Sequence, residues 1–381
     1  MLSAGFIASE GSRRRRRIDG MALCSGRWAA SAYNQPFRVA SISKMITALG
    51  FMPLLARGRI GLDDDISIHL GESLRHPEFP GHPITVRMLL THTSGLRNGD
   101  DFPVPFNRPL LRHLSEAAAQ ENYRGWFGPA SEPPGVWFRY SDTNFALVAQ
   151  IIERVTGVRF DRYMHETLFA PMNLEIGYNW SGVSQRKRRR AAAACRWIGG
   201  AWRAEVDAEP PLAPALALYR GENNESATEA DYAIGENGFA FAPHGGLRLT
   251  LADMDRLARF FLQGAPIDGA SAVALMSAGP WRYNAAAPNG ATENGFYQAY
   301  GLGLQMPLGT GDAFFGAATP GWRGHCGDAY GWMTGLWWNE RTQSTLVYAI
   351  NGMPENERPH GNRSAMTAPE EAVIDAALAQ R

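Results

Sequence analysis

The chain has 381 residues, 45% of them hydrophobic, so it can bury a large core and lacks the composition of a disordered protein. Its 37 Lys and Arg balance 37 Asp and Glu, which excludes the general attraction to nucleic acid or anionic membranes that a strongly basic chain has. No run of about 18 apolar residues predicts a transmembrane helix. Three widely spaced cysteines and the lack of a His-Glu-x-x-His pattern predict no disulfide framework, metal or cofactor.

The N-terminal region contains a run of five arginines, Arg13–Arg17. We expect residues 1–17 to form a basic, disordered tail. The next stretch contains Asp19 and Arg27, so it is a poor apolar core for an export signal, and the compartment stays open between cytoplasm and periplasm. Two short strands are predicted after the tail, at Met21–Ala32 and Gln35–Ala40.

Ser41-Ile42-Ser43-Lys44 stands where an extended segment turns into an apolar helix. A serine at a helix start meets free backbone N–H groups and partial positive charge, which favour a developing anion. Lys44 lies three residues on, so its amine shares a helix face with the Ser41 hydroxyl and can take its proton. The alternative interpretation is that Ser41 only begins a helix.

A second Ser-x-x-Lys match occurs at Ser184 to Lys187, inside a polar, basic run that is typical of a solvated surface. Ser41 differs because it opens an apolar helix. Lys44 and Lys187 are also the only lysines in a chain that otherwise uses arginine. Arginine cannot give up its proton in a protein, so a retained lysine favours proton transfer at Lys44.

The middle of the chain predicts helices separated by loops. Ile84–Leu96 is expected to be a short helix capped by Thr85, with His92 and Ser94 bonding local backbone at its end. Asn98–Pro109 is a polar, Pro-rich loop that could edge a cleft. Further helices are predicted at Phe145–Val155 and Leu251–Leu262 from their apolar periodicity.

The last hundred residues predict strands at Leu302–Met306, Gly331–Trp338 and Thr345–Asn351, then a closing helix at Ala368–Gln380. Strands near both ends with helices between them predict an α+β fold. In this fold a sheet built from both termini, residues 18–75 and 290–381, forms an α/β domain. Residues 76–289 form an inserted, mainly helical domain.

A serine–lysine nucleophile also needs a proton relay and an anion hole. Tyr140-Ser141-Asp142 contains the only tyrosine with Asn or Asp two residues on, and it precedes a helix. His-x-Gly begins at His69, His244 and His325, but only His325-Cys326-Gly327 lies just before a strong pair of strands. We therefore select these two segments as partners of Ser41.

In this order the segments resemble the serine β-lactamase-related penicillin-recognising hydrolases, the group of class C β-lactamases, D-alanyl-D-alanine carboxypeptidases, D-aminopeptidases and related esterases. The resemblance runs from about Phe37 to Asn351 and implies a β-lactamase/transpeptidase-like fold with the site in a groove between its domains. The matching segments are Ser41–Lys44, Met88–Leu96, Tyr140–Asn144, Gly245–Leu247, His325–Gly327 and the strand pair that follows.

The resemblance also implies roles for the site residues. Ser41 would be acylated, while Lys44 and Tyr140 would share general-base and general-acid duty. The backbone N–H groups of Ser41 and Asp328 would form the oxyanion hole. Asp142, His325, Gly327 and Asp328 would contact the substrate, a small molecule or peptide.

Three departures from the family pattern matter. Asp142 replaces the more usual asparagine, and either favours a charged Lys44 or only bonds its loop. His325 replaces the lysine of true β-lactamases, which favours an amide or ester substrate such as a D-amino-acid peptide over a β-lactam. The segment before Ser41 is short for the two strands and leading helix that the family has there. Asp328 is also unusual, and could bind a substrate ammonium or contribute only its backbone. A β-lactamase, or a penicillin-binding sensor that acylates without turnover, is the alternative function, and the oligomeric state is not predicted.

Overall fold

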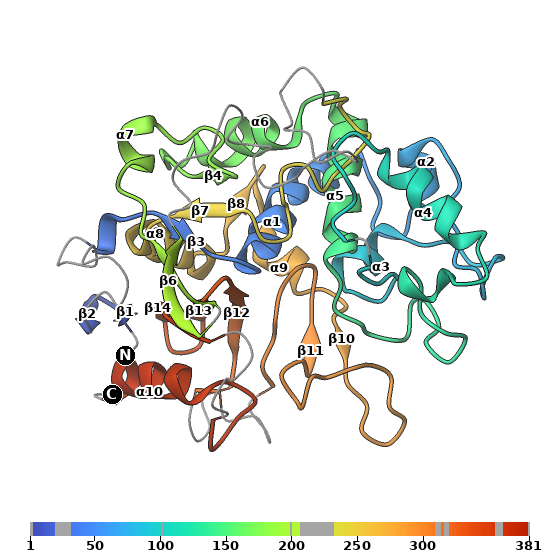
Figure 1. Ribbon diagram of the computed structural model, residues 1–381. Helices are drawn as coiled ribbons and strands as arrows, with labels where there is room; N and C mark the ends of the chain where they lie inside the picture. Colours follow the sequence, from blue (N-terminus) through green and yellow to red (C-terminus); the bar gives the residue numbers. More distant parts are fainter. Residues whose placement is uncertain are drawn as a thin grey trace.

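The computed structural model describes residues 3–19, 32–100, 102–198, 200–205, 232–308, 314–315, 320–354 and 361–379. One half is a five-stranded sheet with a helix on each face, and the other half is mainly helical (Figure 1). Within these residues no helix is long and apolar enough to cross a membrane.

The central sheet is antiparallel and has the strand order β12-β13-β14-β1-β2. The N-terminal region supplies two strands and the C-terminal region three, so a sheet built from both termini is confirmed, but its N-terminal strands lie at residues 3–19 and almost entirely before the predicted residues 18–75. The bounds are β1 Ser3–Glu10, β2 Arg13–Asp19, β12 Trp322–Ala329, β13 Trp332–Asn339 and β14 Ser344–Asn351.

The predicted disordered tail over residues 1–17 is wrong for the described part, residues 3–17, which contains β1 and most of β2. β1 pairs along the whole of β14, and its Phe6 and Ile7 are buried on opposite faces of the sheet. Arginines are tolerated in β2 because it is an edge strand, and Arg14 forms an ion pair with Asp255. The composition of the run suggested disorder, but pairing with a distant strand decides the structure.

Two helices cover the sheet. α8, Leu251–Leu262, packs on β1, β13 and β14, where Phe261 stacks on Trp338 at 4.6 Å between ring centroids. α10, Ala368–Leu378, covers the other face with Val373 and Ile374. Both begin with a capping box, at Thr250 and Thr367 respectively, which satisfies N–H groups of the first turn. Because α8 packs on the sheet, the expected helical domain over residues 76–289 includes a helix of the sheet-based half.

α1, Ile42–Ala56, lies between the two halves and contacts α5, α9, β12 and β13. Its side chains are buried from Ile42 to Leu54, and it continues through Pro53 without a break. The remaining helices are α2 Ile66–Leu70, α3 Val86–Leu90, α4 Leu110–Ala118, α5 Asp142–Thr156, α6 Phe160–Met164, α7 Gln185–Arg188 and α9 Ala272–Met276, with a π-helical turn at His165–Phe169 and 3₁₀ turns at Ala32–Asn34 and Tyr123–Gly125.

A small sheet with the order β3-β7-β4 holds the segment before α1. Of the two strands predicted before Ser41, the first lies outside the described residues over 21–31, and the second, Gln35–Ala40, contains only the two residues of β3. The predicted strand at Leu302–Met306 is instead a loop with a single bridge residue, Gln305. The short strands are β3 Phe37–Arg38, β4 Gly177–Tyr178, β5 Ala194–Ile198, β6 Ala201–Glu205, β7 Leu247–Leu249, β8 Pro266–Ile267, β9 Ala270–Ser271, β10 Trp281–Arg282 and β11 Ala299–Tyr300.

Candidate active site

Ser41 stands at the N-terminus of α1, directly after a residue in an unusual backbone conformation. Ala40 has φ 49°, in the left-handed region that costs a non-glycine residue about 1–2 kcal/mol. The Ser41 hydroxyl does not cap its own helix, although serine commonly does so at this position. It accepts instead from Lys44 Nζ at 3.1 Å, so the hydroxyl is turned toward the lysine.

Lys44 is fully buried, and its amine meets three oxygens. Nζ lies 3.1 Å from Ser41 Oγ, 2.9 Å from the carbonyl oxygen of His244 and 2.5 Å from Asp142 Oδ1. Three acceptors match the three N–H groups of an ammonium. Burial lowers the pKa of Lys44, while the charge of Asp142 and its hydrogen bond oppose that shift. Lys44 is therefore held beside the serine hydroxyl by groups from two other segments.

Asp142 is the first residue of α5, and its carboxylate pairs with Lys44 rather than only bonding its loop. Burial alone would raise its pKa, but the charge of Lys44, its hydrogen bond to the carboxylate and the nearby histidines together outweigh burial and lower the pKa of Asp142 to about 2. Asn98 Oδ1 accepts from the backbone N–H of Asp142 at 2.9 Å and of Thr143 at 3.3 Å. Asn98 thus caps α5 in place of Ser141, which makes no side-chain cap, and fixes the start of the helix.

Tyr140 lies beside Lys44, whose Nζ is 4.6 Å from the centroid of the tyrosine ring. The ring stacks on Tyr297 at 5.0 Å between centroids and packs on His92 at 4.4 Å. Burial, reinforced by the negative charge of Asp142, holds the pKa of Tyr140 well above its usual value, while the neighbouring Ser41 hydroxyl opposes this weakly. The phenol is therefore protonated near neutral pH and can act as a proton donor.

His92 and Ser94 organise the Tyr140 segment. The expected bond to local backbone is present for Ser94, whose Oγ accepts from Leu96 N at 3.1 Å, but both residues also bind distant groups. His92 Nδ1 accepts from Ser141 N at 3.2 Å and faces Asn144 Nδ2 at 3.1 Å. Ser94 Oγ donates to Asn144 Oδ1 at 2.5 Å. Burial lowers the pKa of His92 well below its usual value, so the neutral ring can accept these bonds. Because the partners lie about 50 residues away in the chain, only the fold could connect them.

His325 lies behind Tyr140 rather than on a cavity wall, with ring centroids 6.2 Å apart. It is 1% exposed, its Nε2 lies 2.8 Å from Tyr300 Oη, and its Nδ1 meets the carbonyl oxygen of Cys326. Burial lowers the pKa of His325 to about 3, so the ring is neutral. We expected His325 to contact the substrate, but in the structure its ring is buried and has no surface exposed to a ligand.

Gly327 and Asp328 bring strand β12 against the nucleophile segment. A Cβ at position 327 would lie 2.1 Å from the Val39 carbonyl oxygen, so only glycine allows this approach. Thr334 Oγ1 on β13 donates to the same carbonyl at 2.9 Å and ties the two segments together. Asp328 consequently lines the space around Ser41.

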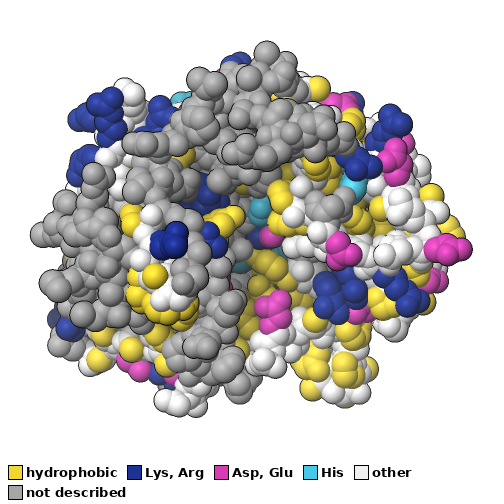
Figure 2. Space-filling view, viewed as in Figure 1, with side chains coloured by type: hydrophobic (Ala, Val, Ile, Leu, Met, Phe, Trp, Pro, Cys, Tyr) yellow, Lys and Arg dark blue, Asp and Glu magenta, His cyan; other side chains and the backbone are white. Residues whose placement is uncertain are grey.

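Two cavities meet at Ser41, Asp142 and Asp328. The face shown in Figure 2 is hollowed near its centre, where histidine and acidic side chains are visible. The first cavity, about 400 Å³, is lined by Arg38, Ala40, Ser41, Phe102, Pro103, Asp142, Arg196, His244, Gly245, Asp328, Ala329 and Tyr330. The second, about 430 Å³, is lined by Ser41, Tyr140, Asp142, Glu293, Asn294, Phe296, Tyr297, Cys326, Gly327, Asp328, Met333, Ala365, Thr367 and Glu370.

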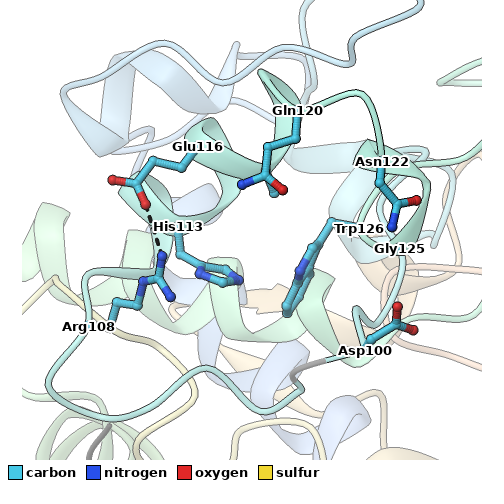
Figure 3. A pocket seen from close by; sticks show the side chains of 9 residues that line it. Asp100, Arg108, His113, Glu116, Gln120, Asn122, Gly125 and Trp126 are labelled. Carbon is cyan, nitrogen blue, oxygen red and sulfur yellow. Dashed lines mark hydrogen bonds and ion pairs between the residues drawn. The ribbon is translucent and has the colours of Figure 1, made fainter.

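A third cavity, about 230 Å³, lies in the helical half and shares no lining residue with the first two (Figure 3). Its walls include Asp100, His113, Trp126 and the ion pair between Arg108 and Glu116, whose atoms are 2.9 Å apart. No serine or lysine is among its described lining residues, so it does not hold a serine–lysine pair. In the described part of the chain, no group of three His, Cys, Asp or Glu side chains could hold a metal ion.

The second Ser-x-x-Lys match has a structural role. Ser184 Oγ accepts from the backbone N–H of Lys187 at 3.2 Å and so caps α7. Ser41, in contrast, does not cap α1. Lys187 Nζ turns away and pairs with Asp253 at 2.9 Å. Of the two pairs, only that of Ser41 and Lys44 has the lysine amine donating to the serine hydroxyl, and its serine lines a cavity.

The site contains a serine and a buried lysine at the start of a helix, beside the edge strand of an antiparallel sheet. This is the arrangement of a serine–lysine site that the sequence motifs predicted. The chain belongs to the β-lactamase family, whose family model, described as "Beta-lactamase", matches residues 21–368. This assignment confirms the resemblance to the serine β-lactamase-related proteins.

Curated relatives include penicillin-binding protein 4* of Bacillus subtilis, 33% identical over 156 residues, which are 38% of this chain and 31% of the relative. Monacolin J acid methylbutanoyltransferase of Aspergillus terreus is 29% identical over 158 residues, 36% of this chain and 37% of the relative. The chain therefore spans about a third of the length of the curated relatives it matches.

Solved structures match over nearly the whole chain. D-amino acid amidase from Ochrobactrum anthropi SV3, complexed with L-phenylalanine amide, has a TM-score of 0.66 and 17% identity, covering 99% of this chain and 93% of that one. A D-stereospecific amidohydrolase from Streptomyces sp. has a TM-score of 0.61 and 22% identity, covering 100% and 94%. These similarities confirm the predicted α+β, β-lactamase/transpeptidase-like fold.

Proposed function

We propose that the protein is a serine hydrolase that forms an acyl-enzyme on Ser41 and cleaves an amide or ester, such as a D-amino-acid amide or peptide or a small ester. The observation that carries this proposal is the hydrogen bond of 3.1 Å between Lys44 Nζ and Ser41 Oγ, with the amine buried and the hydroxyl open to two cavities. A serine hydroxyl becomes a nucleophile when a positioned base takes its proton.

Lys44 takes the proton of Ser41 as the hydroxyl attacks the substrate carbonyl. Only a neutral amine can accept it, and burial favours the neutral form, while Asp142 at 2.5 Å favours the charged form. Because the pKa of Asp142 is about 2, its carboxylate is ionised at neutral pH, so it orients the amine but does not accept the proton. The reactive fraction of Lys44 therefore depends on the balance between burial and this carboxylate.

Tyr140 donates a proton to the leaving group as the tetrahedral intermediate collapses, because its phenol stays protonated in this site. The oxyanion is bound by the backbone N–H groups of Ser41 and Asp328. Ser41 contributes the positive end of α1, and Gly327 lets β12 approach closely enough to bring Asp328 near. A water molecule then releases the acyl group by the reverse proton transfers.

The substrate proposal rests on two observations. Buried, neutral His325 replaces the lysine cation expected in a β-lactamase, which supports an amide or ester substrate. Proteins of the same fold include a D-amino acid amidase and a D-stereospecific amidohydrolase. A second candidate, a β-lactamase or a penicillin-binding sensor, is favoured by the relative named penicillin-binding protein 4*.

A substrate panel tests the proposal: chromogenic short-chain esters, D-amino-acid anilides, a D-Ala-D-Ala peptide and a chromogenic cephalosporin. Ser41→Ala and Lys44→Arg should abolish turnover of the best substrate, since they remove the nucleophile and the proton acceptor. Ser184→Ala is the matched control, because it removes the serine of the other Ser-x-x-Lys pair. Full activity of Ser41→Ala would refute the mechanism.

Intact mass spectrometry after exposure to a β-lactam separates the two candidates. A lasting adduct on the wild type that is absent from Ser41→Ala supports a sensor. Rapid return to the free protein, with hydrolysed β-lactam in solution, supports a β-lactamase. No adduct, together with turnover of an amide or ester, supports the function proposed first.

A further inference from the structure

We propose that the leaving group of the substrate carries an ammonium or other cationic group, and that Glu293 recognises this cation in the cavity on the Tyr140 side of Ser41. The inference rests on the proposed function and names its substrate class more narrowly. It follows from the position of Tyr140, the charges in the cavity and the way the turn around Glu293 is held.

Tyr140 identifies which cavity receives the leaving group. It lines the 430 Å³ cavity but not the 400 Å³ cavity, whereas Ser41 lines both. A general acid must lie within hydrogen-bond reach of the atom that departs. The leaving group therefore occupies the 430 Å³ cavity, and the acyl group extends into the other.

The leaving-group cavity carries negative charge. Asp142, Glu293, Asp328 and Glu370 line it, and Asp142 is paired with Lys44, while no Lys, Arg or His is among its described lining residues. Glu370 is already bound by Tyr348 Oη at 2.8 Å and by Thr367 at the start of α10. In the part of the chain that the structure describes, the Glu293 carboxylate makes neither a hydrogen bond nor an ion pair. Glu293 is therefore available to a ligand.

Arg139 does not satisfy Glu293. Within the described ranges, Arg139 is the one positive group whose charge affects the Glu293 carboxyl, and its guanidinium is bound to Glu132 at 2.7 Å. The aromatic rings of Phe296 and Tyr297 line the same cavity and suit the apolar part of an ammonium ligand. A cationic leaving group would thus meet both a carboxylate and aromatic surfaces.

The turn that carries Glu293 is held in a costly conformation. Glu293, Asn294 and Gly295 have φ of 48°, 59° and 91°, three successive left-handed residues of which two are not glycine. Such a turn persists only where its surroundings determine it, and such strain gathers at ligand sites. Gly295 N donates to Thr292 Oγ1 at 3.3 Å, and Tyr297 N donates to Thr292 O at 2.9 Å.

The same turn is attached to the segment that carries Tyr140. Ala291 N donates to the carbonyl oxygen of Phe138 at 2.9 Å, two residues before Tyr140. Tyr297, at the other end of the turn, stacks on the Tyr140 ring. The position of Glu293 is therefore fixed relative to the proposed proton donor, as recognition of a leaving group requires.

Two thioesters with the same acyl group test the inference. Acetylthiocholine and S-(3,3-dimethylbutyl) thioacetate have leaving groups of the same shape, but only the first is cationic, and both release a thiol that is followed by colour. We expect wild type to favour the cationic ester in kcat/KM by about tenfold, a size suited to one partly exposed charge pair. In Glu293→Gln the ratio should fall to near one.

Glu72→Gln is the matched control, because Glu72 is exposed and lines none of the three cavities. It should keep the wild-type ratio. Higher salt should lower the ratio in wild type, since a charge interaction at a cavity mouth is screened. An unchanged ratio in Glu293→Gln, or equal kcat/KM for both esters in wild type, would overturn the inference.

Binding to a Ser41→Ala background separates this inference from the proposed function. Calorimetry with the two intact thioesters measures charge recognition without turnover. Tighter binding of the cationic ester that Glu293→Gln abolishes supports the inference even where wild type hydrolyses neither ester. Equal affinity for both esters refutes it even where hydrolysis by Ser41 is established.

Discussion

Gly327→Ala tests how closely strand β12 must approach the nucleophile. The added Cβ would lie 2.1 Å from the Val39 carbonyl oxygen and 2.4 Å from Thr334 Oγ1. The threonine hydroxyl can rotate, but the carbonyl belongs to the backbone just before Ala40 and Ser41. Relief of the clash therefore needs β12 and the Ser41 segment to separate by about 1 Å, the size of misplacement that can cost 10²-fold in rate.

We expect kcat/KM for the best substrate to fall by about 10²-fold in Gly327→Ala, because the Asp328 N–H moves away from the oxyanion. Overpacking should lower the free energy of unfolding by only about 1–3 kcal/mol, which leaves the protein folded. Single-turnover acylation and thermal melts, measured on the same samples, separate the two effects.

Gly81→Ala is the control for the glycine substitution itself, because a Cβ there meets nothing within 4 Å. It should retain activity and stability. Wild-type acylation by a folded Gly327→Ala variant would show that the close approach of β12 has no part in catalysis, and the proposed oxyanion hole would then be wrong.

Three further predictions concern the groups around the site. Asp142→Asn removes the charge that opposes the lowered pKa of Lys44, so the acid limb of the kcat/KM profile should move to lower pH; an unmoved limb would exclude Lys44 as the titrating base. Asn98→Ala removes the cap of α5, so unfolding should become easier by about 1 kcal/mol and kcat should fall, as urea titration and kinetics would measure; unchanged values would mean that Asn98 positions nothing. Glu153 is buried with a pKa raised to about 7, so its contribution to stability is full below its usual pKa and is lost as pH rises through 7, by about 3 kcal/mol. Urea unfolding from pH 5 to 8 should show this slope in wild type and a flatter one in Glu153→Gln, and equal slopes would contradict the assignment.

The parts of the site that the sequence predicted are those built from local spacing. Lys44 reaches Ser41 because three residues of a helix bring them to one face, and Asp142 follows Tyr140 at the start of the next long helix. The family motifs then supplied the order of the distant segments. The strands after His325 were predicted because their β-favouring residues need no knowledge of the partner strand.

The parts that the sequence did not predict depend on contacts between distant segments. His92 binds Ser141 N across 49 residues, and Asn98 caps α5 across 44, and neither spacing has a local pattern. His325 matched a motif, but its burial under Tyr300 depends on β11, a short strand that the sequence did not predict. The arginine run of β2 was wrongly predicted to be disordered. Its composition reflects only the preference of the isolated segment, whereas its structure depends on pairing with β1.

The pairing of β1 with β14 has a practical consequence for anyone who shortens the chain. The family match begins at residue 21, after both N-terminal strands, so trimming to that boundary would remove β1 and β2 together. β14 would then expose eight residues of unpaired backbone along a buried, apolar strand. Such an edge templates pairing between molecules, so the trimmed protein should aggregate even with every residue near Ser41 intact.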